Sequence, residues 1–335
     1  MRYFLGADVG ATKTHVLIAD EGGQAVGFGQ GGPGNHESVG YDGLARALGQ
    51  ATHKALAAAS LSHADLAGAG FGVAGYDWPD ERADTLAAIA TLGLSAPIGA
   101  VNDTLIGLLA GSEAGWGVAV VSGTGCNCWG WDRTRQREGQ VTGGGQRMGE
   151  AAGAAELVAQ AVRAVAYAWT GRGPATRLSA AFIRHTGARD LADLLHGITE
   201  GHLELSARAA PLVFEVAAGG DAVARAVIDW AGRELGALAA TVARQLKFEA
   251  LDFDLVMVGS LFNGGSLLIE PMRATILATA PGARLVRLST PPVVGAVLLG
   301  MEQAGLNTAG SRPNLVASTQ ALLQSAVPLA GLTAR

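Results

Sequence analysis

Cysteine is scarce in this chain of 335 residues, and its two cysteines stand close together. Cys126 and Cys128 are too few and too near each other to form a disulfide framework. Such scarcity fits a reducing compartment. A small secreted fold held together by disulfides is therefore excluded.

Charged residues are also sparse, at 16%, and Lys and Arg are scattered along the chain. With a net charge of −5, the chain has no basic cluster of the kind that binds a nucleic-acid backbone. Its Ala-rich stretches still carry charges too often to span a bilayer. Residues 1–5 run directly into a strand-like segment, without a signal-peptide core or a cleavage site. We therefore expect a soluble, cytoplasmic protein that acts on small molecules, with no nucleic-acid or membrane partner.

Apolar residues and glycine, by contrast, are abundant. Hydrophobic residues make up 49% of the chain, enough for a sizeable core, and the length suggests two domains or one large one. The 49 glycines exceed what an average domain carries. They gather between apolar runs, in residues 22–34, 68–75, 115–130 and 143–153. Glycine in such places permits sharp turns and lets the backbone approach a ligand closely.

The pattern of apolar residues predicts a repeated order of elements. The first half shows a three-strand antiparallel meander followed by alternating helices and strands: strands 3–8, 15–19, 25–29, 69–74 and 98–101, and helices 41–59, 79–92 and 104–109. The second half restarts with strands 116–122, 126–132 and a third from 140–142, then helices 151–170, 177–185, 191–197 and 206–248, strand 254–258, helix 266–280, strand 284–288 and helix 292–304. The long helical stretch is expected to break near residues 219–220. The repeat predicts two similar α/β lobes.

The first strand ends in a turn that could bind phosphate. Asp8 stands at the strand end, where a carboxylate can hold Mg²⁺ through water. Gly10 frees the turn, so that backbone N–H groups and the hydroxyls of Thr12 and Thr14 can face phosphate oxygens. Lys13 adds a point charge. An ordinary hairpin with a polar tip would explain the same residues.

A second turn of this kind follows the apolar strand of the second half. Gly123, Thr124 and Gly125 form a small, hydroxyl-bearing turn directly after Ser122. A tight hairpin again accounts for this turn taken alone. Two such turns at the starts of two similar lobes favour a site in which both hold the phosphates of one nucleotide.

These segments, taken in order, resemble the motifs of the sugar kinase, Hsp70 and actin superfamily. The segments are residues 8–14, 102–103, 122–127, 259–260 and 292–299. Within this superfamily the chain is similar to the N-acetylglucosamine kinase and BadF/BadG-type ATPase family over residues 3–303. The resemblance implies an α/β fold of two ribonuclease H-like, actin-like ATPase lobes around an interdomain cleft. It also implies the cofactors ATP and Mg²⁺, an amino-sugar substrate and a homodimer.

The same resemblance sets the expected domain boundaries. The first lobe would comprise residues 1–112, completed by helix 292–304, in which Gly295 and Ala296 permit close packing at a hinge. The second lobe would comprise residues 113–291. Residues 305–335 carry few signals and are left as a tail of unknown role.

Asp103 is the expected general base. It follows the strand 98–101 and precedes a helix, a position from which a carboxylate projects toward a cleft. An Asp there could equally cap the helix that begins at Thr104. The resemblance implies that Asp103 takes the proton of the substrate hydroxyl as that hydroxyl attacks the γ-phosphoryl group.

The expected sugar site draws on glycine-bent loops that carry amide and carboxylate groups. By resemblance Asn35 and Asn127 contact the sugar, and we add His36, Gly75 and Asp77 to this site. His36 could equally be an ordinary loop histidine. The acid-rich stretch 77–84 is otherwise interpreted as the solvated start of a helix.

Two further positions follow from the resemblance. Glu150 stands where the family usually has the Asp that binds the sugar, and the acid that usually follows is absent. One extra methylene shifts a carboxylate enough to alter specificity. Gly259 and Ser260 would lie beside the adenosine of the nucleotide, although a plain strand-to-helix turn would look the same.

We thus expect phosphorylation of N-acetylglucosamine to its 6-phosphate, with glucosamine as the alternative sugar. ROK sugar kinases open similarly, but their cysteine-rich zinc motif and Glu-x-Gly-His segment are missing. An ATPase of the 2-hydroxyacyl-CoA dehydratase activator type would need cysteines at two helix starts. A sugar-sensing regulator and an ATPase that drives a protein partner stay open as alternatives.

Overall fold

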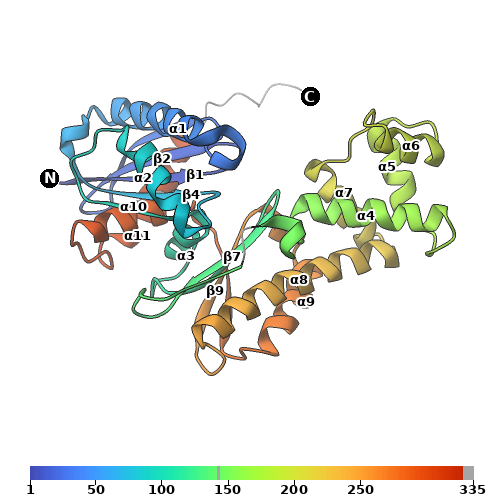
Figure 1. Ribbon diagram of the computed structural model, residues 1–335. Coiled ribbons are helices and arrows are strands. Elements are labelled where there is room, and N and C mark those ends of the chain that lie inside the picture. Colours follow the sequence, from blue (N-terminus) through green and yellow to red (C-terminus); the bar gives the residue numbers. More distant parts are fainter. Residues whose placement is uncertain (142–143, 327–335) are drawn as a thin grey trace. The chain divides into compact units, whose positions relative to one another are not determined.

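The computed structural model describes residues 1–141 and 144–326, which fall into two compact units (Figure 1). The first unit comprises Met1–Gly117 together with the chain from Val286 onward, and the second comprises Val118–Leu285. Each unit is built around a five-stranded sheet. In the described part of the chain, no helix is long and apolar enough to cross a membrane.

The first sheet has the strand order β3-β2-β1-β4-β5. Its strands are β1 (Tyr3–Val9), β2 (Thr14–Asp20), β3 (Ala25–Gly31), β4 (Leu66–Val73) and β5 (Ile98–Asn102). The first three form the predicted antiparallel meander, and β4 pairs in parallel with both β1 and β5. The carboxyl ends of β1, β4 and β5 therefore meet at one edge of this sheet, the edge where α/β proteins bind ligands.

Helices cover both faces of this sheet. They are α1 (His36–Ala59), α2 (Arg82–Ala90), α3 (Asp103–Gly111), α10 (Val293–Gln303) and α11 (Arg312–Ala326), with short 3₁₀ turns η1 (His63–Asp65) and η2 (Pro79–Glu81). Because side chains alternate along a strand, Leu5 packs against α1 on one face, whereas Phe4 packs against α10 on the other. Leu5 and Phe4 are themselves fully buried, in two apolar layers on opposite faces of the sheet.

Helix α11 lies in the stretch that the sequence left unassigned. Its Ser318 hydroxyl accepts a hydrogen bond from the Ala25 amide (3.0 Å) and donates one to the Gly23 carbonyl (2.9 Å). Leu315 is fully buried beside β2 and α10. The segment 312–326 is thus an integral layer of the first unit.

The second sheet repeats the order of the first. Its strands are β6 (Gly117–Ser122), β7 (Cys126–Trp131), β8 (Glu138–Gln140), β9 (Phe253–Val258) and β10 (Ala283–Arg287), in the order β10-β9-β6-β7-β8. In both sheets the first three strands are neighbours in sequence order and the fourth and fifth follow on the far side of the first. The predicted repeat of topology is confirmed. The third strand begins earlier than expected, and residue 142 of the expected strand lies outside the described residues.

Most of the second unit is helical. The helices are α4 (Ala154–Trp169), α5 (Leu178–Thr186), α6 (Leu191–Thr199), α7 (Ala210–Ala218), α8 (Ala222–Leu246) and α9 (Ser266–Leu277), with 3₁₀ turns η3 (Gly145–Met148), η4 (Ala207–Ala209) and η5 (Ser260–Gly264). The predicted break of the long helical stretch occurs between α7 and α8, where Asp221 caps α8 by accepting a hydrogen bond from the Ala224 amide (2.8 Å). Figure 1 shows α8 and α9 side by side, and α5 and α6 away from the sheet.

Candidate active site

Two carboxylates lie at the carboxyl edge of the first sheet. Asp8 stands near the end of β1, and burial raises its pKa to about 6 although the Lys13 ammonium opposes this shift. Asp103 is the first residue of α3, and burial together with the negative charge of Asp8 raises its pKa to about 7. A carboxylate with a pKa near the working pH is suited to accept a proton.

Asn102 holds the start of α3. Its side-chain Oδ1 accepts a hydrogen bond from the Thr104 amide (2.9 Å), so Asn102 is the cap of this helix. Its Nδ2 donates to the Asp77 carboxylate (2.8 Å) and to the Tyr76 carbonyl (3.2 Å). The helix-capping role that the sequence also allowed for Asp103 therefore belongs to the preceding residue.

The loop after β3 meets the loop after β4 at the same edge. Asn35 caps α1, since its Oδ1 accepts a hydrogen bond from the Glu37 amide (2.9 Å), and its Nδ2 donates to the Glu37 carboxylate (3.1 Å). Gly75 has a left-handed backbone (φ +82°), and a methyl group at this position would collide with Asn35 Oδ1. Only glycine fits this contact without strain.

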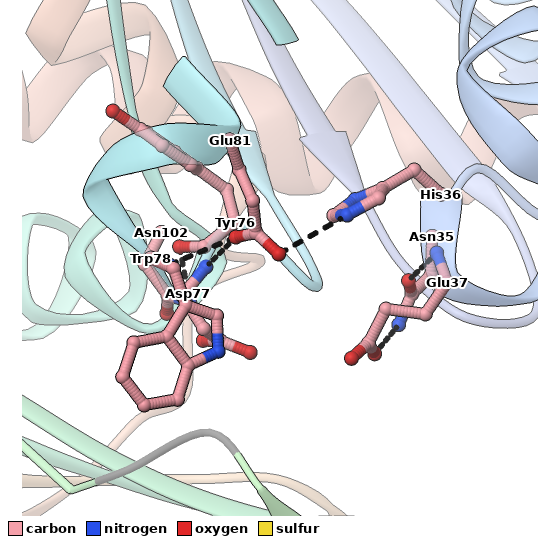
Figure 2. Close-up of polar contacts among 8 residues, drawn as sticks. All are labelled: Asn35, His36, Glu37, Tyr76, Asp77, Trp78, Glu81 and Asn102. Atoms are coloured by element: carbon pink, nitrogen blue, oxygen red, sulfur yellow. Dashed lines mark hydrogen bonds and ion pairs between the residues drawn. The ribbon is translucent and has the colours of Figure 1, made fainter. Parts of the chain in front are cut away.

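His36 is held by two neighbours, Tyr41 and Glu81, of which Figure 2 shows Glu81. Its ring stacks on Tyr41, with centroids 4.5 Å apart and an interplanar angle of 11°. Its Nε2 lies 3.4 Å from Glu81 Oε1, and its Nδ1 is buried with no hydrogen-bond partner among the described residues. His36 is therefore held in place in the first unit, not exposed at a loop tip.

The interpretation of residues 77–84 as a solvated helix start was wrong at two positions. Asp77 is only 7% exposed and bonds to Asn102. The Glu81 carboxylate accepts hydrogen bonds from the amides of Asp77 and Trp78, both at 2.8 Å. Glu81 also contacts His36, which lies 45 residues earlier in the chain. No local sequence pattern could therefore have predicted that Glu81 links these two segments.

The first expected phosphate turn is a closed hairpin turn between β1 and β2. The Gly10 amide donates a hydrogen bond to the Lys13 carbonyl (3.0 Å). Thr12 and Lys13 are exposed at its tip. The hydroxyl of Thr14 is buried and has no hydrogen-bond partner in the described part of the chain. The turn presents a hydroxyl and an ammonium group beside Asp8.

The second expected phosphate turn rests on the start of α4. The Gly123 amide donates to the Gly125 carbonyl (2.9 Å), and the amides of Ala154 and Ala155 donate to the carbonyls of Gly123 (2.8 Å) and Thr124 (3.0 Å). The first amides of α4 are thus satisfied by the carbonyls of this turn, which fixes the turn against the start of the helix.

The expected adenosine segment adjoins this turn. Gly259 has φ +112°, and a methyl group here would collide with the Ser122 carbonyl oxygen. Next to Ser260 lies a cavity of about 440 Å³, which Arg208, Phe214 and Asn263 also line. A cavity of this size can hold a nucleoside.

The remaining expected sugar residues lie in the second unit. Asn127 Oδ1 accepts a hydrogen bond from the Cys128 amide (2.7 Å). Glu150 is 4% exposed, and its carboxylate accepts a hydrogen bond from the Gly145 amide (2.9 Å). The Glu150 carboxylate is thus bonded to its own loop.

The model of the BadF/BadG/BcrA/BcrD ATPase family matches residues 5–300. The chain belongs to this ATPase family. That membership agrees with the resemblance in its motifs and with the repeated topology of its two sheets.

Individual relatives span nearly the whole chain. The N-acetylmuramic acid/N-acetylglucosamine kinase of Clostridium acetobutylicum is 25% identical over 311 residues, which cover 90% of this chain and 99% of the relative. The N-acetyl-D-glucosamine kinase of Dictyostelium discoideum is 24% identical, with 89% of this chain and 97% of the relative covered. A solved structure from Chromobacterium violaceum, described as a candidate N-acetylglucosamine kinase, shares the fold with a TM-score of 0.66 and 23% identity, covering 89% of this chain and 99% of that one.

Proposed function

We propose that this protein is an ATP-dependent kinase that phosphorylates an amino sugar, namely N-acetylglucosamine at its 6-hydroxyl. The observation that carries the proposal is Asp103, a carboxylate with a pKa raised to about 7 at the carboxyl edge of a sheet, beside Asp8. Membership of the ATPase family supports ATP as the nucleotide, and the names of the two kinase relatives support N-acetylglucosamine as the sugar.

Asp103 acts as the general base. Its carboxylate takes the proton from the sugar hydroxyl while the hydroxyl oxygen forms a bond to the γ-phosphorus. The bond between that phosphorus and the bridging oxygen of the β-phosphate breaks, so that ADP leaves with the electron pair. Raising the pKa of the base toward neutrality increases its proton affinity without leaving it fully protonated at neutral pH.

Asp8 is the proposed ligand for Mg²⁺. The described residues contain no cluster of three or more side chains that could hold a metal ion. This donor set still fits magnesium, which usually binds one or two carboxylates and completes its shell with water and substrate phosphates. When bound, Mg²⁺ neutralises charge on the transferring phosphoryl group. Without a cation, the pKa of Asp8 is raised to about 6, so its carboxyl group is partly protonated near neutral pH. A bound cation would favour the ionised carboxylate.

Residues suited to nucleotide binding occur in each of the two units. In the first, the turn after Gly10 offers the exposed groups of Thr12 and Lys13, whereas the Thr14 hydroxyl, which the sequence also suggested, is buried. In the second, the turn at Gly123, Thr124 and Gly125 binds phosphate at the start of α4, and the cavity beside Gly259 and Ser260 holds the adenosine.

The sugar contacts come from amide, carboxylate and imidazole groups. The first unit offers Asn35, His36 and Asp77 on loops that the close contact at Gly75 keeps together. The second offers Asn127 and Glu150.

We also propose a homodimer, which sedimentation of the purified protein would test.

A coupled assay of ADP release tests the function. The enzyme with MgATP is given N-acetylglucosamine, glucosamine, N-acetylmuramic acid, glucose or no sugar. We expect ADP release that depends on sugar and is fastest with N-acetylglucosamine, and a 6-phosphate product by NMR. Steady ADP release that no sugar accelerates would contradict the proposal and favour an ATPase that acts on a protein partner.

A further inference from the structure

Glu81 joins two loops of the first unit that are far apart in sequence. One of its carboxylate oxygens accepts hydrogen bonds from the amides of Asp77 and Trp78, each at 2.8 Å. The other lies 3.4 Å from His36 Nε2. Figure 2 shows this carboxylate between the loop after β4 and the start of α1. A single side chain thus couples the positions of both loops.

The same side chain connects to the carboxyl end of β5. The Asp77 amide donates to Glu81, and the Asp77 carboxylate accepts a hydrogen bond from Asn102 Nδ2 (2.8 Å). Asn102 in turn caps the helix that begins at Asp103. Hydrogen bonds therefore connect Glu81 through Asp77 to Asn102, the residue that precedes Asp103, and the ion-pair contact with Glu81 adds His36 to this series.

Ordinary capping accounts for only part of this arrangement. The 3₁₀ turn η2 starts after Trp78, and Glu81 satisfies the Trp78 amide as the third residue of a capping box. Neither the bond from the Asp77 amide nor the contact with His36 is needed for that motif. The side chains of both partners are largely covered, with 9% of His36 and 19% of Glu81 exposed. In such a place solvent screens the attraction between a carboxylate and an imidazole N–H less than at an open surface.

We propose that Glu81 is a positioning residue for the sugar, which it orients through His36 and the loop of Asp77. The inference rests on the proposed sugar kinase activity and deepens it, because it assigns a role to a residue outside the expected binding groups. Glu81 touches neither the nucleotide turns nor Asp103, so its loss acts on the binding of the sugar and not on the binding of ATP.

Two substitutions separate the contacts of Glu81. In Glu81→Gln the amide oxygen still accepts from the backbone of the loop, but the NH₂ group cannot accept from His36 Nε2–H. Glu81→Ala removes both the hydrogen bonds from the loop amides and the contact with His36. Asp84→Asn, at an exposed position one turn further along α2, is the matched control for loss of one negative charge.

Steady-state kinetics with N-acetylglucosamine and ATP give the test. We expect Glu81→Gln to raise the KM for the sugar by about tenfold, because the contact that holds His36 is lost, and Glu81→Ala to raise it further, because the loop amides also lose their acceptor. The KM for ATP should stay within about twofold in both variants, and Asp84→Asn should match the wild type. In a His36→Phe background, which keeps the stacking on Tyr41, the effect of Glu81→Gln should shrink markedly.

The possible results of these measurements distinguish failure of the positioning role of Glu81 from failure of the proposed kinase function. If the wild type phosphorylates the sugar and Glu81→Gln and Glu81→Ala leave its KM unchanged, the positioning role is refuted while the kinase function stands. A parallel rise in both KM values with a lowered Tm would show a purely structural role and refute it too. A wild type that transfers phosphate to no sugar would refute the proposed function itself.

Discussion

Asp8 and Asp103 lie at the carboxyl ends of β1 and β5, on either side of β4, and the charge of Asp8 adds to burial in raising the pKa of Asp103. Both carboxyl groups therefore resist ionisation, Asp8 up to about pH 6 and Asp103 up to about pH 7. Such an arrangement costs stability at neutral pH, and a cation or a proton donor nearby would relieve it. Functional sites commonly carry this kind of strain.

Asp103→Asn should stabilise the ligand-free protein at high pH. A group whose pKa is raised by folding contributes its stability below its unfolded pKa, near 3.8, and loses it as the pH rises through the folded value near 7. The wild type therefore weakens across this window relative to the variant, which has no proton to lose. Thermal unfolding should give a Tm for Asp103→Asn that is higher by about 2 °C or more at pH 8.

The pH dependence of this difference is the check. Near pH 4 the two proteins should have similar Tm values, and the gap should grow up to about pH 7 and then level off. Asp84→Asn, which removes an exposed charge, should show no such growing gap. A Tm for Asp103→Asn below that of the wild type at pH 8 would mean that the ionised carboxylate is stabilised, contrary to this account.

Gly75→Ala should weaken sugar binding. The added methyl group meets Asn35 Oδ1 and also sits on a left-handed backbone. Since Asn35 caps α1 and is a proposed sugar contact, its displacement should raise the KM for the sugar by about tenfold or more, because small misplacements in a site are costly. The KM for ATP should change little.

Gly93→Ala is the matched control for this substitution. Gly93 is also left-handed (φ +63°), but a methyl group there meets no atom within 4 Å. Both variants carry the backbone strain, and only Gly75→Ala disturbs Asn35. Equal sugar KM values for the two variants would rule out the contact as a cause.

Arg312→Ala should destabilise the first unit. The Arg312 guanidinium donates hydrogen bonds to the carbonyls of Leu109, Ala110 (3.2 Å) and Ser112 (2.8 Å), at the carboxyl end of α3. Loss of these charge-assisted bonds should cost about 1–3 kcal/mol. Chemical unfolding measures this change, with the exposed Arg82→Ala as control. A loss below about 0.5 kcal/mol would show that α11 is not anchored in this way.

The order of elements followed from apolar periodicity and from glycine placement. The meander of β1 to β3 and the break between α7 and α8 are local features, since alternating side chains and paired glycines mark them directly. The start of α1 was misplaced by five residues, because Gly40 has φ +68° inside it and a helix normally does not continue through such a residue.

Features that depend on residues far apart in the chain could not be predicted from the sequence. Helix α11 buries Leu315 and packs Val316 and Leu322 against the same core, but polar residues such as Ser318 also face inward, so its apolar periodicity is weak. The role of Glu81 depends on His36, which only the fold brings near. The raised pKa of Asp103 likewise depends on the fold, which buries the carboxyl group and brings Asp8 to the same sheet edge.

The central claim is that Asp103 accepts the proton of the sugar hydroxyl, and the activity of an Asp103→Asn variant tests it most directly. With MgATP and N-acetylglucosamine, Asp103→Asn should lower kcat by about 10²–10⁴-fold, because its side chain keeps the shape but cannot accept the proton. Nucleotide binding, measured by calorimetry, should remain within about twofold of the wild type. Sugar phosphorylation by Asp103→Asn at a near-normal rate would contradict the account.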